Sequence, residues 1–298
     1  MENQTPVNAG PGPYVVIGAT GHIGRVLART LLEKNQKVIA VAHDAAKGEW
    51  LKSAGADVAI LDVRDAQALR VVLRRARRAF LLNPPAAVNT ETDVEETRTA
   101  ASIADAVRGS GLDKVLIEST YGARPGNATG DLSVLWNFER SVASAEIPMA
   151  VNRGAYYFSN LDMLLEEARA GSITTMFPAN LKIPMVAPAD LGIAAAGRLS
   201  GSLDDIGIQY VEGPEKYSFH DVATAFANAL GYAVTVRTLE RSQWEPNFRR
   251  AGFSEPAARA YARMTEVSLQ GFETPNNPIR GTTSLESYIR QLVNATGG

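Results

Sequence analysis

Short apolar runs alternate with segments of helical periodicity through the first half of the chain. Runs rich in Val, Ile, Leu and Ala, as buried strands are, occur at 14–17, 37–42, 57–62, 78–82, 114–119 and 149–153. Segments with apolar residues three and four positions apart lie between them, at 23–35, 45–54, 65–75, 92–107 and 133–144. The helix at 92–107 opens on the capping-box pattern Thr92-x-x-Glu95. This order predicts an α/β fold with a doubly wound parallel sheet.

The pattern changes after residue 155. Helical periodicity then dominates, at 158–167, 188–200, 218–230, 241–251, 255–270 and 284–294, with short extended runs at 183–186, 209–211 and 233–238. We therefore expect a Rossmann domain over 14–155 and a smaller, mostly helical lobe over 156–298, some of whose extended segments rejoin the sheet. Residues 1–13 are polar and rich in Pro and Gly, which predicts a disordered leader.

The amino-acid composition excludes several kinds of chemistry and binding. The 298 residues include no cysteine and three histidines, which excludes disulfides and thiolate catalysis and disfavours a metal site. A net charge of −2 gives no general attraction to nucleic acid or to an anionic membrane. The arginine-rich run at 74–78 contains no aromatic residue and is typical of a solvated helix end. With no signal peptide and no apolar run near the ~20 residues of a membrane span, we expect a cytoplasmic protein.

The strongest local motif is the glycine pattern Gly18-x-x-Gly21-x-x-Gly24, which follows the first strand and opens the first helix. In a dinucleotide site the first glycine permits a tight turn, the second lets the backbone approach a pyrophosphate, and the third allows close helix packing. The spacing alone is weak evidence, and a structural turn is the alternative, but the flanking strand and helix favour a cofactor site. The predicted contacts are Gly18, Thr20, Gly21, His22, Ile23 and Gly24.

The end of the second strand bears on which dinucleotide binds. No acidic residue stands at the strand end itself; His43 does, and Lys47 follows one helical turn later. These two side chains suit a 2′-phosphate, so NADP(H) is favoured, while NAD(H) stays open. The alternative is that Asp44 caps the next helix and that His43 and Lys47 are ordinary surface residues.

These motifs, in this order, resemble the NmrA-like atypical short-chain dehydrogenase/reductase family, and most closely its flavin-free NADPH-dependent quinone oxidoreductases. The resemblance rests on residues 18–24, 43–47, 61–63, 80–85, 153–160, 186–192 and 212–215. It implies that Asp62 and Val63 lie against the adenine, and that Asn83 and Pro84 lie against the ribose and nicotinamide. His43 stands where the family usually has arginine. We also expect cofactor contacts from Ser119 and Arg153, at the ends of the fifth and sixth strands.

The catalytic residues are harder to assign. None of the nine tyrosines has a lysine four residues on, so the Tyr-x-x-x-Lys pair of typical short-chain dehydrogenases is absent. Catalytic relatives often carry a lysine or histidine at the position that Leu135 occupies here. The remaining candidates are Tyr121, Asn137 and Tyr156, at or beyond the carboxyl ends of strands, with packing or cofactor contact as the alternative for each.

Two functions follow from this pattern. The first is an NAD(P)H-dependent oxidoreductase that transfers a hydride to a quinone or a similar small carbonyl or enone acceptor. An aromatic set would suit a flat ring, and would equally suit the core: Trp136, Phe138, Tyr156, Tyr157 and Phe158. The second is a non-catalytic redox sensor that binds NADP(H) or NAD(H) and regulates a protein partner. The missing Tyr–Lys pair favours the sensor, and the continuous reductase-like pattern favours the enzyme.

Overall fold

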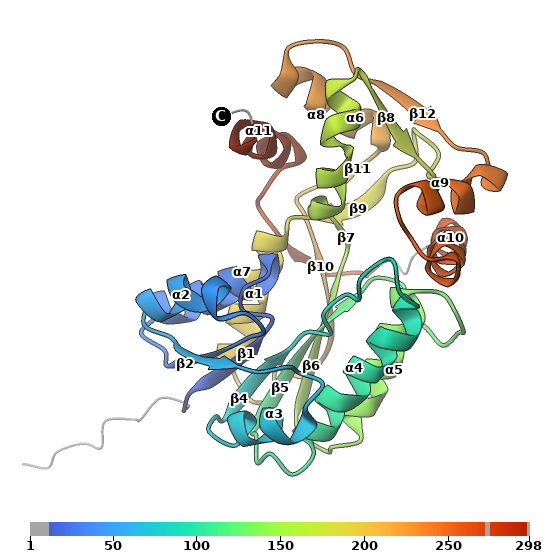
Figure 1. Ribbon diagram of the computed structural model, residues 1–298. Helices are drawn as coiled ribbons and strands as arrows, with labels where there is room; N and C mark the ends of the chain where they lie inside the picture. The colour runs from blue at the N-terminus through green and yellow to red at the C-terminus, as the bar shows by residue number, and fades with distance from the viewer. Residues whose placement is uncertain (1–11, 272–274, 297–298) are drawn as a thin grey trace, which may run out of the picture.

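The central sheet contains eight strands in the order β13-β10-β6-β5-β4-β1-β2-β3, and every neighbouring pair is parallel. The computed structural model describes residues 12–271 and 275–296 (Figure 1). The strands of this sheet are β1 (Tyr14–Ile17), β2 (Val38–Ala42), β3 (Asp57–Ile60), β4 (Arg78–Leu81), β5 (Lys114–Thr120), β6 (Met149–Gly154), β10 (Gly207–Glu212) and β13 (Ile279–Arg280). The predicted doubly wound parallel sheet is confirmed.

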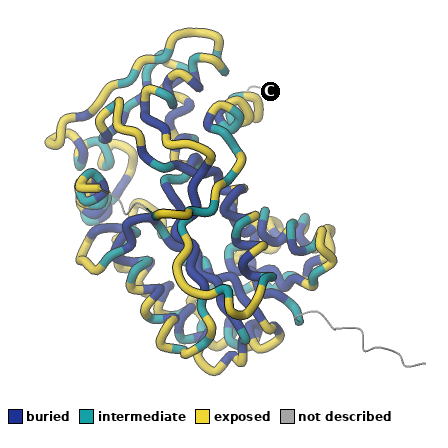
Figure 2. The backbone as a smooth tube through the Cα atoms, turned by 180° about the vertical axis from the view of Figure 1, so that it is seen from behind, coloured by how far each residue is buried: buried dark blue, intermediate teal, exposed yellow. Residues whose placement is uncertain are grey.

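Helices cover both faces of the sheet. One face carries α1 (His22–Glu33), α2 (Ala45–Ser53) and α7 (Pro188–Ser200), and the other carries α3 (Ala66–Leu73), α4 (Thr92–Val107) and α5 (Asp131–Ala143). Side chains alternate between the two cores, so Val16 faces α1 whereas Val15 faces α3 and α4. Figure 2 shows the central strands buried and the outer turns of the helices exposed.

Three elements of the second half belong to this layered body. Helix α7 packs on α1 so closely that a Cβ on Gly192 would lie 2.7 Å from the Cβ of Val26. Strand β10 pairs with β6, and β13 pairs with β10. The sheet therefore draws on residues on both sides of position 155, and the division into two domains there stays a prediction.

The remaining elements form a smaller lobe, at the top of Figure 1. Its helices are η1 (Phe158–Leu164), α6 (Leu165–Arg169), α8 (Phe219–Leu230), η2 (Arg241–Gln243), α9 (Trp244–Arg250), α10 (Glu255–Leu269) and α11 (Leu285–Ala295). Its strands are β7 (Tyr156–Tyr157), β8 (Ser172–Thr175), β9 (Ile183–Val186), β11 (Lys216–Tyr217) and β12 (Thr235–Thr238), in a sheet of three and a sheet of two. The predicted leader, residues 1–13, lies outside the described residues except for its last two.

One local prediction is wrong, and another holds only in part. Thr92 does not cap α4: the helix begins with it, Glu91 stands at the N-cap, and no side chain caps the end. Thr92 is 1% exposed, so its side chain packs in the interior instead of closing the helix. The arginine run is solvated only in part, because Arg78 lies buried on β4 and donates to the carbonyl oxygens of Leu199 and Gly201 at 2.7 and 2.6 Å. Within the described residues, no helix is long and apolar enough to cross a membrane.

Candidate functional site

The loop between β1 and α1 carries the three motif glycines, and each has a different reason to be glycine. Gly18 has a φ of +72°, which side chains rarely permit. A Cβ on Gly24 would lie 2.2 Å from the Gly18 carbonyl oxygen, so α1 packs on the loop only because residue 24 lacks one. A Cβ on Gly21 would meet the same oxygen at 3.4 Å, an ordinary contact. The fold does not require Gly21, and its small size matters for a molecule that approaches the loop from outside.

The N-terminus of α1 lies open beside this loop. Gly21 is the N-cap and brings no capping side chain, and the first turn contains no acidic residue. Ile23 is buried in the core and anchors the helix start, while Gly21 and His22 are exposed and Thr20 is half-buried. The first N–H groups of a helix have no partner within it, and they lie at the positive end of its dipole. This arrangement can hold a phosphate or another anion.

The end of β2 lies next to this loop, because β1 and β2 are parallel neighbours. Asp44 is the N-cap of α2, and its carboxylate accepts the Ala46 N–H at 2.9 Å, which confirms the capping interpretation. His43 and Lys47 are both exposed. Their contact with a 2′-phosphate stays a prediction.

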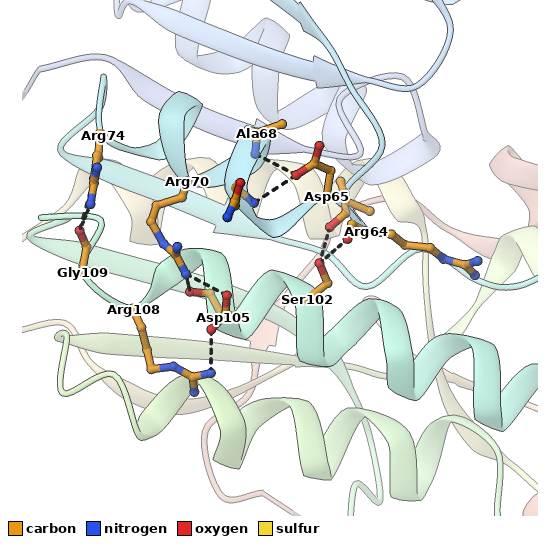
Figure 3. Close-up of polar contacts among 11 residues, drawn as sticks. Arg64, Asp65, Ala68, Arg70, Arg74, Ser102, Asp105, Arg108 and Gly109 are labelled. Atoms are coloured by element: carbon orange, nitrogen blue, oxygen red, sulfur yellow. Dashed lines mark hydrogen bonds and ion pairs between the residues drawn. The ribbon is translucent and has the colours of Figure 1, made fainter.

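The turn after β3 is fixed against α4. Asp62 Oδ1 accepts the Arg64 N–H at 2.9 Å, and the Ser102 hydroxyl donates to the carbonyl oxygens of Val63 and Arg64 at 3.1 and 2.8 Å. Figure 3 shows Ser102 reaching from α4 to this turn. Asp62 is exposed and Val63 half-buried, so the turn presents one polar and one apolar side chain from a rigid support.

The turn after β4 is held at both of its ends by one residue of α4. The Asn83 side-chain amide donates to the Glu96 backbone oxygen at 3.2 Å, and the Ala86 N–H donates to Glu96 Oε1 at 2.9 Å. Pro84 lies between these two contacts. The side-chain oxygen of Asn83 is buried and has no hydrogen-bond partner among the described residues. The sequence analysis did not single out Glu96.

Ser119 and Arg153 are brought together by a residue that the sequence analysis missed. The Ser119 hydroxyl donates to Glu139 Oε1 at 2.5 Å, and Arg153 donates to both oxygens of Glu139 at 3.1 and 2.8 Å. All three side chains are buried, where α5 packs on the sheet. Their contact with a cofactor stays a prediction, whereas their mutual bonding secures the ends of β5 and β6.

The three catalytic candidates lie apart from one another. Tyr121 is buried, and its hydroxyl donates to the carboxylate of Glu212, which also pairs with Arg280 at 2.6 Å. Asn137 is exposed on the outer side of α5, away from the sheet that its neighbour Phe138 faces. Tyr156 packs in the lobe, with its ring centre 6.0 Å from that of Phe177 and 6.3 Å from that of Phe219. Burial raises the pKa of Tyr156 to about 12, so its phenol stays protonated at neutral pH.

The five aromatic residues considered for one flat-ring pocket do not form one. Phe138 belongs to the core under α5, and Phe158 belongs to the separate core of the lobe. Trp136 lines a groove of about 490 Å³ on the outer side of β6 and β10. Tyr157 alone reaches the carboxyl end of the sheet, with its hydroxyl 3.5 Å from the Ser119 carbonyl oxygen.

Buried acids gather at this same end of the sheet. Glu118 on β5 is 4% exposed, and burial raises its pKa well above the usual range, which Asn152 and Tyr157 beside it offset only in part. Burial, with the charges of Asp131 and Asp93 adding to it, raises the pKa of Glu96 to about 8. No group of three or more possible metal ligands forms in the described part of the chain. Displaced pKa values of this kind are typical of functional sites.

A parallel sheet in this strand order, with helices on both faces and a glycine loop at the first turn, defines the Rossmann-like class of α/β proteins. The NmrA-like family model matches residues 14–270, and the chain belongs to the NmrA-like family. The resemblance seen in the sequence is thus confirmed.

Individual relatives are distant. The NAD(P)H azoreductase of Xenophilus azovorans is 22% identical over 246 residues, which cover 83% of this chain and 84% of the relative. The structure is similar to that of the NADPH-dependent quinone oxidoreductase of Escherichia coli complexed with NADPH, with a TM-score of 0.78 and 19% identity over 94% of this chain and 100% of that one. It is also similar to NmrA, a negative transcriptional regulator, with a TM-score of 0.69 and 18% identity over 96% of each chain.

Proposed function

We propose that this protein is an NADP(H)-dependent oxidoreductase that reduces a quinone or a similar small carbonyl or enone compound. The observation that carries the proposal is the glycine loop: it leaves room at Gly21, next to an uncapped helix N-terminus with no acidic side chain in its first turn. A loop of this kind at the first turn of a Rossmann sheet is a pyrophosphate site. The azoreductase and the quinone oxidoreductase among the similar proteins support reduction of a conjugated acceptor.

Each turn at this end of the sheet has a part in holding the cofactor. Backbone N–H groups of residues 20–24 would bind the pyrophosphate, and His43 and Lys47 the 2′-phosphate. The turn of Asp62 and Val63 would lie against the adenine, and the 83–86 turn against the nicotinamide side. These four segments follow β1, β2, β3 and β4. The four strands are neighbours in the sheet, so the segments adjoin one another.

The chemistry needs little from the protein beyond position and a hydrogen bond. When bound, NADPH supplies a hydride, which with one proton converts a quinone into a hydroquinone. The chain has to hold the acceptor, exclude water and donate to the oxygen that gains negative charge. Tyr157 suits the last role, because its hydroxyl lies at the carboxyl end of the sheet and burial raises the pKa of its phenol, which keeps it protonated.

The test combines binding with turnover. Titration calorimetry with NADPH is followed by stopped-flow measurement of nicotinamide absorbance with a panel of benzoquinones, naphthoquinones and azo dyes. We expect micromolar binding and acceptor-dependent oxidation, with NADPH binding about a hundredfold weaker in Gly21→Val. Binding without reduction of any acceptor above the uncatalysed rate would overturn the enzyme and favour the second candidate.

The second candidate is a non-catalytic NADP(H)- or NAD(H)-binding regulator. The hydroxyl of Tyr121 already donates to Glu212, and Leu135 cannot transfer a proton. The similarity to NmrA, a transcriptional regulator, points the same way. This candidate predicts a protein partner whose affinity changes between the oxidised and reduced cofactor, which a pull-down with NADP⁺ or NADPH present would reveal.

A further inference from the structure

Glu96 holds the 83–86 turn through two different atoms. Its backbone oxygen accepts the Asn83 amide, and its carboxyl group accepts the Ala86 N–H, at 3.2 and 2.9 Å. The side chain is 3% exposed, in the second turn of α4. The position of this turn therefore depends on where one buried carboxyl group lies.

Other acidic groups face that carboxyl group. Asp93 lies on the same helix, Asp131 on α5 and the Tyr261 phenol on α10. The side chains of Glu96 and Asp131 form a hydrogen bond, which requires a proton on one of them. Two adjacent carboxyl groups out of water keep such a proton well above the usual pH range of an acid.

The α10 helix closes the outer side of this pair. Ser254, at its N-cap, donates from its backbone and hydroxyl groups to the carbonyl oxygens of Val88 and Thr90, at 2.8 and 2.5 Å. Arg263 donates to the Asn127 carbonyl oxygen at 3.2 Å. Figure 1 shows α10 across the ends of α4 and α5. The lobe thus limits the access of water to the shared proton.

We propose that Glu96, carrying the proton it shares with Asp131, is a positioning residue that fixes the 83–86 turn against the nicotinamide half of the cofactor. This inference rests on the proposed function, which supplies the role of the turn. Loss of the proton leaves three carboxylates side by side. Asp93 keeps the Gly130 N–H at 3.1 Å, and Asp131 keeps its place at the N-terminus of α5, so Glu96 is the group that moves away and releases Ala86.

The sign of the pH dependence follows from the direction of the shift. Burial first, and then the charges of Asp131 and Asp93, raise the pKa of Glu96 to about 8, while the Ala86 N–H opposes the rise. The proton is present below that pH and lost above it. NADPH should therefore bind tightly near neutrality and more weakly at alkaline pH.

The experiment measures the dissociation constant of NADPH from about pH 7 to about pH 9.5, a range above the second ionisation of its 2′-phosphate. For the wild-type protein we expect the affinity for NADPH to fall about tenfold. A fall of this size corresponds to a difference of about one unit between the pKa of Glu96 in the free and in the NADPH-bound protein. Glu96→Gln preserves an acceptor for Ala86 and a donor for Asp131 but cannot ionise, so its affinity should not change over this range. Glu91→Gln, which removes an exposed acid from the same end of α4, is the matched control and should follow the wild type.

A second ligand separates the turn from the rest of the site. 2′,5′-ADP lacks the nicotinamide half, so its affinity for the wild-type protein should stay constant over the same range. A constant NADPH affinity in the wild type, a wild-type curve in Glu96→Gln, or an equal fall for 2′,5′-ADP would each overturn the inference. If folded wild-type protein fails to bind NADPH even at neutral pH, the proposed function itself falls and the inference with it.

Discussion

The amino and carboxyl ends of the central sheet differ in the charged side chains that are buried there. At the amino end the buried side chains are cations: Arg78, Lys114 and Arg198 are 8%, 0% and 6% exposed. Lys114 donates to the carbonyl oxygens of Arg198 and Ser202 at 2.8 and 2.7 Å, and Arg78 donates to the carbonyl oxygen of Leu199. Arg78 and Lys114 thus satisfy carbonyl groups in the last turn of α7 and lie at the negative end of its dipole.

At the carboxyl end the buried side chains are mostly acids: Glu139 and Glu212 pair with Arg153 and Arg280, whereas Glu96 and Glu118 form no ion pair among the described residues. Glu118 has Asn152 and Tyr157 beside its carboxyl group, and the carboxyl groups of Glu96 and Asp131 face each other. Burial raises the pKa of each of these groups. Paired cations stabilise the amino end, whereas the acids keep raised pKa values where ligands bind in open α/β sheets. The cations that bond to α7 and the acids with raised pKa values thus lie at opposite ends of one sheet.

The largest expected effect comes from substitutions at two glycines of one loop, which separate a role in stability from a role in binding. Gly24→Ala would place a Cβ 2.2 Å from the Gly18 carbonyl oxygen, so we expect a loss of about 3 kcal/mol in the free energy of unfolding. Gly21→Val should leave stability nearly unchanged and weaken NADPH binding about a hundredfold, because its side chain enters the space of the pyrophosphate. Urea unfolding and calorimetry measure the two quantities. Equal losses of stability in both variants would contradict the distinction.

The next effect concerns the amino end. Lys114→Met removes the donor to one carbonyl group in the last turn of α7 and one just beyond it, and we expect the free energy of unfolding to fall by about 2 kcal/mol. The NADPH affinity of the folded variant should not change, because Lys114 lies at the end of the sheet opposite the glycine loop. Lys37→Met, an exposed lysine before β2, is the matched control and should change stability by less than about 0.5 kcal/mol. Urea unfolding that fails to separate the two variants would show that Lys114 does not stabilise α7.

A smaller effect concerns Glu118 at the carboxyl end. Burial raises its folded-state pKa, so its contribution to stability is fully present below the unfolded pKa and is lost as pH rises toward the folded value. We expect Glu118→Gln to remove up to about 1.4 kcal/mol per pH unit from the fall in unfolding free energy above about pH 5. Urea unfolding at a series of pH values measures this slope. A variant with the wild-type slope would mean that Glu118 is ionised in the folded protein.

Local sequence predicts most of the layered fold and little of the charge network. Strand β1 and helix α7 have the predicted bounds, because apolar runs and helical periodicity are properties of neighbouring residues. The glycine motif of the first loop is also a pattern of neighbouring residues, so the sequence alone reveals it. Glu139, which joins Ser119 to Arg153, and Asp131, which faces Glu96, meet their partners only when β5, α4 and α5 pack together. A buried glutamate inside the strand 114–119 was a visible signal, since an acid rarely lies in a parallel strand without a role.

The smallest effect tests the cofactor choice at the end of β2. His43 and Lys47 are exposed, so each contact with a 2′-phosphate is screened by water and should change the ratio of NADPH to NADH affinity by about fivefold. His43→Arg, which adds a permanent charge and a planar set of donors, should raise the ratio, whereas His43→Ala and Lys47→Met should lower it. Lys52→Met, on the same helix but further from the strand end, is the matched control and should leave the ratio unchanged. NADH affinity should be the same in all four variants, because NADH carries no 2′-phosphate. If calorimetry gives one ratio for the wild type and every variant, the 2′-phosphate lies elsewhere, and the carboxyl end of β2 has no part in distinguishing the two cofactors.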